Sequence, residues 1–434
     1  MQMLLNTSVA AASYSDETNY TNIYRVEPGS TLSIQQQSIH KRKYWHLKRQ
    51  QDQFHYSRPQ EYLEHFSSLL NEGIKLQVAG SSNFACEFSG GLDSATIVTG
   101  FRQLGLSPTL LIHIAPKDSA EIDDSHYAAQ VIQQYKLNDV QYVDATSFDL
   151  HEVIKQTSSW FAGTPQYIFP ICAHNIHQAM VNLTKNKLVT AAVPSLFSGF
   201  GGDECVSGHA PLALCLQEYL ANQDYTRAWQ ELHAYYAVNK LPQPNSMRLG
   251  LTILRNLYPE IFSKILRWRQ ITAKSQQSPL KSTSRRIGSL HEHEVNLLQG
   301  PLSQHLRLRV EESAISAKAM GFRYQYPLLY PKLVEFCHNL PLALKRNQGE
   351  NRLMVRNYLA QYLPAAVYQK HTKSGGIMPA TLDKIRHEYA AGNYKNLFKH
   401  LPYANQVDDL EHPHTSAAQL LQQILLLGLK QYLN

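Results

Sequence analysis

The residues best suited to chemistry form the loop Ser89-Gly-Gly-Leu-Asp-Ser94, which follows a short apolar run and precedes a helical pattern. Glycines let the backbone approach a polyanion closely, and a helix N-terminus presents free N–H groups and the positive end of its dipole. Asp93 would repel phosphate unless a Mg²⁺ ion joined its carboxylate to the phosphate oxygens. The loop differs from the Gly-x-x-x-x-Gly-Lys-Ser/Thr loop of common nucleoside triphosphatases. We predict a pyrophosphate-binding loop rather than a plain strand-to-helix turn.

A second glycine-rich loop, Ser198-Gly-Phe-Gly-Gly-Asp-Glu204, also follows an apolar run and also places an acid after glycines, at the expected start of a helix. By itself this loop could be a structural turn. At the carboxyl edge of one parallel sheet, however, Asp93 and Asp203 could share one metal–pyrophosphate group. We therefore predict these two aspartates as the metal ligands.

The segments around both loops alternate between helical and strand patterns. Residues 59–76 have apolar groups at helical spacing. The expected elements after them are strand 83–88, helix 93–104, strand 109–114, helix 123–135, strand 140–143, helix 173–183 and strand 187–193. This alternation predicts an α/β fold with a doubly wound parallel sheet, and a ligand site beyond the carboxyl ends of the strands.

The remaining segments suggest how the chain is divided. Residues 1–55 are polar and too few for a domain, so we expect a short extended lead-in. Residues 56–434 should form one domain, with a nucleotide-binding α/β part (56–208) and a mainly helical part (209–434) in which the strand pattern disappears. The Ser-, Gln- and Lys-rich stretch 272–286 is expected to be a loop.

Composition excludes several classes of protein. The chain is 43% hydrophobic and 17% charged, and no apolar run approaches the roughly 20 residues that cross a bilayer. The start has no secretory pattern, and the five cysteines form no Cys-x-x-Cys pair, so we expect a cytoplasmic protein with free thiols and no zinc site. A net charge of +7 fits a phosphate site and a peptide partner as well as nucleic acid.

The two loops, in this order, resemble the synthetase domain of the asparagine synthetase family, whose relatives include beta-lactam synthetases and lasso peptide cyclases. Shorter segments also match the family: Tyr24-Arg-Val-Glu-Pro-Gly29, Asp123-Asp-Ser-His-Tyr-Ala128, Tyr324-Gln-Tyr-Pro-Leu-Leu329, Arg352-x-x-x-Arg356 and Lys373-Ser-Gly375. The resemblance covers about residues 22–380.

This resemblance implies an ATP pyrophosphatase fold of the adenine nucleotide alpha hydrolase-like type, with ATP as substrate and Mg²⁺ as cofactor. A carboxylate would attack the α-phosphorus to give an acyl-adenylate and pyrophosphate, and an amine would then displace AMP. Lys373 matches the lysine that neutralises charge in that step. The implied nucleotide-binding residues are Phe88, Ser89, Gly90, Gly91, Asp93, Ser94, Ile114, Ser198 and Gly199, with Asp93 and Asp203 on the metal.

The sequence departs from the family at several points. Glutamine-using members begin with a cysteine nucleophile on a separate domain, whereas the first cysteine here is Cys86, so we expect no release of ammonia from glutamine. Phe200 stands where asparagine synthetases have a glutamate and beta-lactam synthetases a tyrosine, and Tyr330 replaces an aspartate. Glu312 is our candidate for the missing acid; the alternative for Glu312 is a solvated helix face.

We therefore expect an ATP-dependent amide-forming ligase acting on a carboxylate other than free aspartate. Lasso-type cyclisation of a precursor peptide, with a leader peptidase as partner, is the first hypothesis, and another natural-product amide is the second. Asparagine formation with free ammonia or a partner glutaminase is the alternative with the same mechanism. The alternative of another class is a tRNA-modifying ATP pyrophosphatase, which usually carries cysteine pairs or an RNA module absent here. We expect no membrane or nucleic-acid partner.

Overall fold

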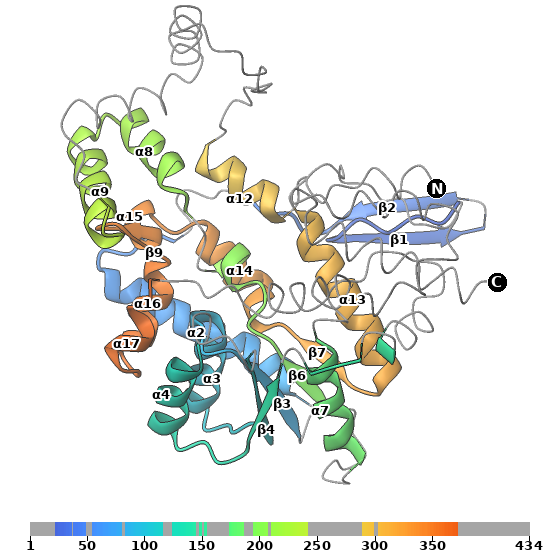
Figure 1. The fold of residues 1–434 in the computed structure, drawn as a ribbon. Coiled ribbons are helices and arrows are strands. Elements are labelled where there is room, and N and C mark those ends of the chain that lie inside the picture. Colours follow the sequence, from blue (N-terminus) through green and yellow to red (C-terminus); the bar gives the residue numbers. More distant parts are fainter. Residues whose placement is uncertain are drawn as a thin grey trace, which may run out of the picture.

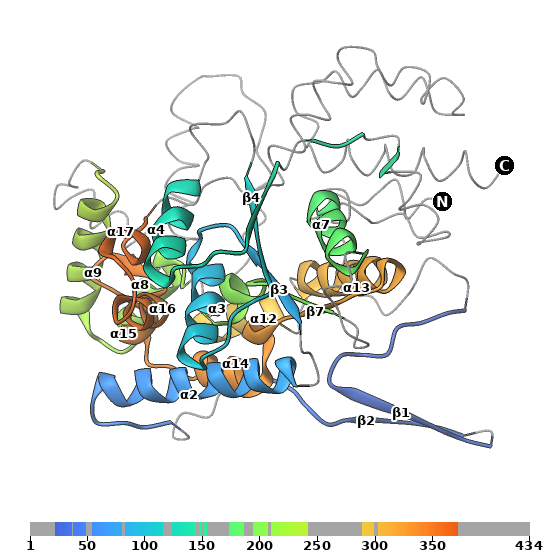
Figure 2. The ribbon, with the colours of Figure 1, turned by 90° about the horizontal axis from the view of Figure 1, so that it is seen from below.

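The centre of the fold is a five-stranded parallel sheet with helices on both faces (Figures 1 and 2). In the computed structural model, the described residues are 22–36, 38–48, 54–79, 83–115, 124–144, 147–149, 152–153, 173–185, 194–206, 210–241, 289–298 and 303–371. The doubly wound α/β fold predicted from the sequence is confirmed by this sheet. No helix within the described ranges is long and apolar enough to cross a membrane.

The strand order of the central sheet is β5-β4-β3-β6-β7, and every neighbouring pair is parallel. Its strands are β3 (Phe84–Phe88), β4 (Leu110–Ala115), β5 (Val140–Asp144), β6 (Ser195–Phe197) and β7 (Arg323–Gln325). The chain order reverses between β3 and β6, so the loops after these two central strands lie at a topological switch point, where α/β proteins place their ligands.

Most of the described chain outside the sheet is helical. The α-helices are α2 (Pro59–Val78), α3 (Leu92–Gln103), α4 (Ser125–Tyr135), α7 (His174–Lys185), α8 (Leu212–Ala221), α9 (Tyr225–Val238), α12 (Leu290–Leu298), α13 (Gln304–Met320), α14 (Pro331–His338), α15 (Leu342–Lys345), α16 (Leu353–Ala360) and α17 (Ala365–Tyr368). A π-helical turn η1 (Gly202–Val206), a 3₁₀ turn η3 (Pro327–Leu329) and a small hairpin of β8 (Arg346–Asn347) and β9 (Glu350–Asn351) complete the helical part.

Alternation along the strands produces the two helical layers, since successive side chains point to opposite faces of a sheet. On β3, Phe84, Cys86 and Phe88 enter the main core with α2 and α3. Ala85 points to the other face, where it joins a second core formed with α7 and α13. Figure 2 shows α3 and α4 on one side of the strands and α7 and α13 on the other.

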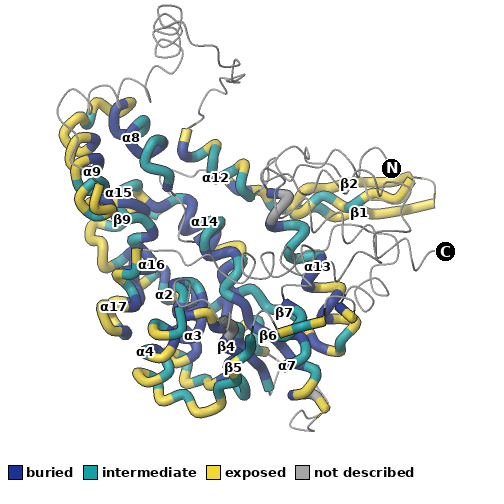
Figure 3. Tube along the Cα trace, in the orientation of Figure 1, coloured by how far each residue is buried: buried dark blue, intermediate teal, exposed yellow. Residues whose placement is uncertain are grey.

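The lead-in forms an antiparallel hairpin of β1 (Ser30–Gln35) and β2 (Ser38–Lys43) that extends away from the sheet (Figure 2). Both strands are largely exposed, as the yellow colour in Figure 3 shows. The hairpin is tied to the domain by Arg25, whose Nε lies 3.0 Å from a carboxylate oxygen of Glu311 in α13. Residues 30–35 and 38–43 are thus extended, while the division of the chain into a lead-in (1–55) and a domain (56–434) stays a prediction.

Two predictions about the strands differ from the structure. The strand pattern does not disappear after residue 209, because β7 from the helical part completes the sheet beside β6. Three residues are too few to create a recognisable alternation, so pairing with β6 rather than sequence pattern defines β7. The strand before the second loop is Ser195–Phe197. The expected strand 187–193 and the loop 272–286 lie outside the described residues.

Candidate active site

The first loop joins β3 to α3 at the carboxyl edge of the sheet. Gly91 is the N-terminal cap of α3, and the first turn of this helix contains Asp93. Ser94 Oγ donates to Gly91 O at 3.0 Å and accepts from Ser89 N at 3.3 Å. Ser89 Oγ accepts from Gly91 N at 3.3 Å. The two serines therefore hold the loop in a tight turn at the N-terminus of α3, the position in a helix that suits an anion.

Gly90 allows this loop to pack against the start of α4. Its φ is +83°, and a Cβ atom there would lie 2.6 Å from Asp124 O. Asp124 in turn pairs through its carboxylate with Lys370, whose ammonium also lies 4.7 Å from the centroid of the Tyr127 ring. The described chain thus passes close to the first loop just before Lys373, which itself lies outside the described residues.

The second loop lies directly against the first. A Cβ atom at Gly199 would be 2.8 Å from Ser94 N, and one at Gly202 would be 2.1 Å from Asp93 Oδ1. Only glycine permits this approach. The structure therefore brings the two loops together, as the sequence analysis expected, while their roles in binding stay predictions. A helical segment begins within this loop, as expected, and its described residues form the π-helical turn η1.

Arg352 joins the two aspartates. One guanidinium nitrogen contacts Asp93 Oδ1, and the other terminal nitrogen lies 2.8 Å from Asp203 Oδ1. The side chains of Arg352, Asp93 and Asp203 are 11%, 22% and 17% exposed, so these are substantially buried charges. Two carboxylates that share one cation form a site built for positive charge.

The turn that carries Arg352 is firmly anchored. Arg352 has a left-handed φ of +61° at the start of α16, directly after the β8–β9 hairpin. Glu231 of α9 holds that hairpin: its carboxylate accepts from Arg346 Nε at 2.7 Å and from Gly349 N at 3.1 Å. Four residues further on, Arg356 donates to Asn351 O and to Lys370 O, both at 2.9 Å. In the Arg-x-x-x-Arg motif, Arg352 thus contacts the two aspartates, and Arg356 binds the backbone of the segments before and after α16.

The pair Asp93 and Asp203 suits Mg²⁺, the cofactor expected from the sequence. Mg²⁺ prefers oxygen ligands and usually takes one or two protein carboxylates, with phosphate oxygens and water completing the shell. The position between the two carboxylates already holds a cation, the Arg352 guanidinium. The described residues contain no cluster of three or more metal-binding side chains.

A buried polar network binds the start of the second loop through Ser198. Ser198 Oγ donates to Glu87 Oε2 at 2.6 Å, and the Tyr324 hydroxyl donates to Glu87 Oε1 at 2.8 Å. His177 Nε2 lies 3.0 Å from the same hydroxyl oxygen. Burial, with a smaller contribution from Arg309, lowers the pKa of His177 to about 3. The imidazole is therefore neutral, and its Nε2–H donates to Tyr324, because the tyrosine proton is already used.

The other predicted binding residues occupy the same edge of the sheet. The Phe88 ring is fully buried in the main core, so only the Phe88 backbone remains to line a nucleoside. Its carbonyl oxygen lies 2.8 Å from His113 Nδ1. Ile114 pairs with Val143 in the β4–β5 ladder, but its side chain is outside the described set. Ser198 is 2% exposed and follows β6 directly.

Phe200 lies between a cation and an aromatic ring. The Arg309 guanidinium carbon is 5.3 Å from the centroid of the Phe200 ring, and the Tyr326 ring meets the Phe200 ring edge to face at 5.9 Å. Glu312, the candidate acid, is 6% exposed in α13 and exerts a negative field at the Tyr326 hydroxyl. Its burial argues against the alternative of a solvated helix face.

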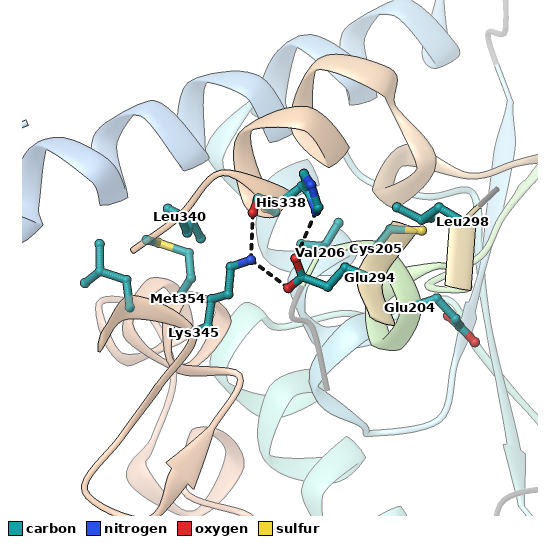
Figure 4. Close-up of a pocket in the computed structure, with 11 residues that line it drawn as sticks. Glu204, Cys205, Val206, Glu294, Leu298, His338, Leu340, Lys345 and Met354 are labelled. Atoms are coloured by element: carbon teal, nitrogen blue, oxygen red, sulfur yellow. Dashed lines mark hydrogen bonds and ion pairs between the residues drawn. The ribbon is translucent and has the colours of Figure 1, made fainter. Parts of the chain in front are cut away.

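A second polar cluster adjoins Cys205 and Val206 of η1 (Figure 4). Lys345 Nζ donates to Glu294 Oε1 at 2.6 Å and to His338 O at 2.7 Å, and His338 Nδ1 lies 2.9 Å from Glu294 Oε2. Burial raises the pKa of Glu294, but the Lys345 charge and both hydrogen bonds outweigh it and hold the pKa below its usual value. The adjoining cavity of about 10 Å³ borders Cys205 of η1 and has room for about one water.

Sequence reasoning missed Arg352, Glu87 and Arg309 as site residues. Arg352 was noted only as part of a family motif, and its distance from the loops in the sequence gave no reason to place it on Asp93. Glu87 stands in an apolar run, where one charged residue in a buried strand was the available signal. Arg309 stands three residues before Glu312 and belongs to no recognisable motif.

Comparison with known proteins identifies one family. The asparagine synthase family model matches residues 65–419. No curated protein matches the chain. Among solved structures, a U34-tRNA thiolase, NcsA, from Methanococcus maripaludis with its [4Fe-4S] cluster matches with 12% identity and a TM-score of 0.23, covering 66% of this chain and 83% of that one. A likeness at that TM-score supports no statement about function.

Proposed function

Because the chain belongs to the asparagine synthase family, whose members are ATP-dependent carbon–nitrogen ligases, we propose that it forms an amide on a carboxylate carried by a peptide or acyl chain. ATP use and the products AMP and pyrophosphate follow from the family. What the proposal adds is the class of substrate. This class of substrate is inferred from the residues around Phe200, namely Arg309 and Tyr326.

Phe200 disfavours free aspartate as the substrate. Its ring cannot accept a hydrogen bond from an ammonium group, and its charged neighbour, Arg309, is itself a cation. An ammonium placed here would be desolvated beside a like charge, at a cost of about 2–4 kcal/mol. A carboxylate on a longer chain brings no ammonium, and its apolar neighbours can pack on Phe200 and Tyr326.

The residues divide the chemistry among them. The loop 89–94 would hold pyrophosphate, the backbone of Phe88, Ser198 and Gly199 with Ile114 would line adenosine, and Asp93 and Asp203 would hold Mg²⁺. When bound, Mg²⁺ would neutralise charge on the departing pyrophosphate. Arg352 would provide a second positive charge beside it.

The reaction then needs two displacements. The substrate carboxylate oxygen attacks the α-phosphorus, and the bond from that phosphorus to pyrophosphate breaks. An amine nitrogen next attacks the acyl carbon, AMP leaves with the electron pair of the broken C–O bond, and the amine loses a proton. Lys373 would offset charge in the first displacement. Glu312, the buried acid near Tyr326, is our candidate for the group that accepts the proton that the amine loses.

Peptide cyclisation of the lasso type is the form of this activity that we favour, with a precursor peptide as substrate and a leader peptidase as partner. Another natural-product amide is the second form. Both require the acyl group on a chain with a blocked or distant amine, which agrees with the aromatic and cationic surroundings of Phe200.

The test compares two acceptors under identical conditions. We expect ATP-dependent pyrophosphate release with an N-acetyl-aspartyl peptide and at least about 30-fold less with free aspartate plus ammonium, from the cost given above. Chromatography of the nucleotide product should show AMP. Phe200→Glu should raise the rate with aspartate only slightly, because Arg309 remains. Efficient asparagine formation from aspartate by the unaltered protein would contradict the proposal and support the asparagine synthase alternative.

A further inference from the structure

A cavity outside the two loops is lined by Tyr326, whose ring contacts that of Phe200. It lies between α13 and β7, measures about 430 Å³, and is thus within the usual size range of ligand pockets. Helix α13 contributes Val310, Ala314 and Lys318, which are spaced four apart and therefore share one face. The wall opposite this helix, here called the floor, contains the rings of Phe322, Tyr324 and Tyr326, which occur at every second residue of the β7 segment.

The floor of this cavity is continuous with the candidate active site. Tyr326 meets Phe200 at one end, and the rings of Tyr326 and Tyr324 stack at 5.6 Å with an interplanar angle of 5°. Phe322 continues the row. At about 3.3 Å per residue, the strand from Phe322 to Tyr326 is as long as about four residues of an extended ligand chain.

The floor is also held in place. Tyr324 uses its hydroxyl to bind Glu87 and meets His177, and Phe322 is only 2% exposed. Tyrosines fixed in this way offer a preformed surface, which lowers the entropy cost of binding.

Charge varies along the cavity. Among the described residues that line it, none is acidic, while Lys318 and Arg323 lie at the end remote from Phe200. The Nε of Arg323 donates to Ser195 Oγ at 3.2 Å, which fixes that guanidinium at the rim. The cavity therefore combines aromatic walls near the site with a basic far end.

We propose that this cavity between α13 and β7 binds an extended peptide segment of the substrate. An apolar side chain next to the reacting carboxylate packs on Tyr326 and Tyr324, and an acidic residue about three or four positions away meets Lys318. The inference rests on the proposed function, since it identifies which peptides that site accepts.

Binding is measured by fluorescence anisotropy, without turnover, on the full chain. The probe is fluorescein-labelled Gly-Asp-Phe-Ser-Ser-Glu; two matched probes replace its Phe by Gly or its Glu by Lys. We expect the Phe probe to bind about ten- to a hundredfold more tightly than the Gly probe, because an aromatic side chain is buried.

Three variants locate the site. Ala314→Trp, at an exposed cavity residue, should remove the preference for Phe, and Lys318→Glu should reverse the preference between Glu and Lys. Ala319→Trp, exposed on the same helix but not among the cavity residues, should bind like the unaltered protein. Failure of the Phe probe to bind, or equal binding to the unaltered protein and Ala314→Trp, would overturn the proposal.

Pyrophosphate release from the same probes separates this inference from the proposed function. Binding that Ala314→Trp abolishes, without release of pyrophosphate, would sustain the cavity and reject the ligase proposal for peptides. Equal release by the unaltered protein and Ala314→Trp at limiting peptide would reject the cavity and sustain the ligase proposal.

Discussion

Replacing Arg352 by glutamine should expose how strongly the candidate site depends on a cation. The change leaves Asp93 and Asp203 without the guanidinium that both contact. At an effective dielectric constant of about 20, two carboxylates on either side of one guanidinium repel by on the order of 3 kcal/mol. Breaking a buried ion pair costs about 3–5 kcal/mol, and partial exposure reduces that figure. We therefore expect Arg352→Gln to lower the free energy of unfolding by about 2–4 kcal/mol at neutral pH.

Mg²⁺ supplies the second half of this test. In the unaltered protein without nucleotide, Arg352 already compensates the aspartates, so Mg²⁺ should leave the free energy of unfolding unchanged. In Arg352→Gln the site is open to the ion, and Mg²⁺ at ten times its dissociation constant should restore about 1.4 kcal/mol. Urea unfolding followed by circular dichroism, with either MgCl₂ or a chelator, measures both effects.

Two controls sharpen the result. Arg352→Lys keeps the charge but loses the planar guanidinium that reaches both carboxylates. Its free energy of unfolding should therefore lie between those of the unaltered protein and Arg352→Gln. Adding Asp203→Asn to Arg352→Gln should relieve the repulsion and abolish the Mg²⁺ response. If the free energy of unfolding of Arg352→Gln is within about 0.5 kcal/mol of that of the unaltered protein and does not change with Mg²⁺, the two carboxylates do not form a cation site.

Three further predictions concern residues around this site. Asp203→Asn should remove most pyrophosphate release while circular dichroism stays unchanged; near-normal turnover at low Mg²⁺ would argue against a metal at Asp203. Gly202→Ala should also suppress activity, because a Cβ would approach Asp93 Oδ1 to 2.1 Å, and a fully active variant would mean that the two loops do not meet. His177, with a pKa lowered to about 3, binds fewer protons folded than unfolded between pH 6.5 and 3, so stability should fall as the pH falls, by about 1.4 kcal/mol per pH unit from this group. His177→Gln should flatten that slope in thermal unfolding between pH 7 and 5, and an unchanged slope would show that His177 titrates normally.

Local patterns in the sequence were sufficient for strands β3, β4 and β5 and for the position of the first loop. Strands β3 and β4 and helices α3 and α4 begin and end within a few residues of the predicted bounds, because apolar periodicity and the Gly-Gly turn are local signals. Strand β7 was missed, since three residues carry no periodicity. The loop at 198–204 and the start of a helix in it were recognised, but the π-helical form of that turn was not.

The sequence by itself determined which residue types meet phosphate: glycines, serines and an aspartate at a helix start have a local physical meaning that needs no tertiary contact. Only the tertiary structure decided what surrounds them. Arg352 lies 259 residues from Asp93 in the chain, and it reaches that carboxylate only because the β8–β9 hairpin is anchored on Glu231. Phe200 was visible as a departure from the family, but its neighbours Arg309 and Tyr326 come from α13 and the end of β7. Such contacts arise from how helices pack on a sheet, and packing between distant segments leaves no periodicity in the sequence from which it could be read.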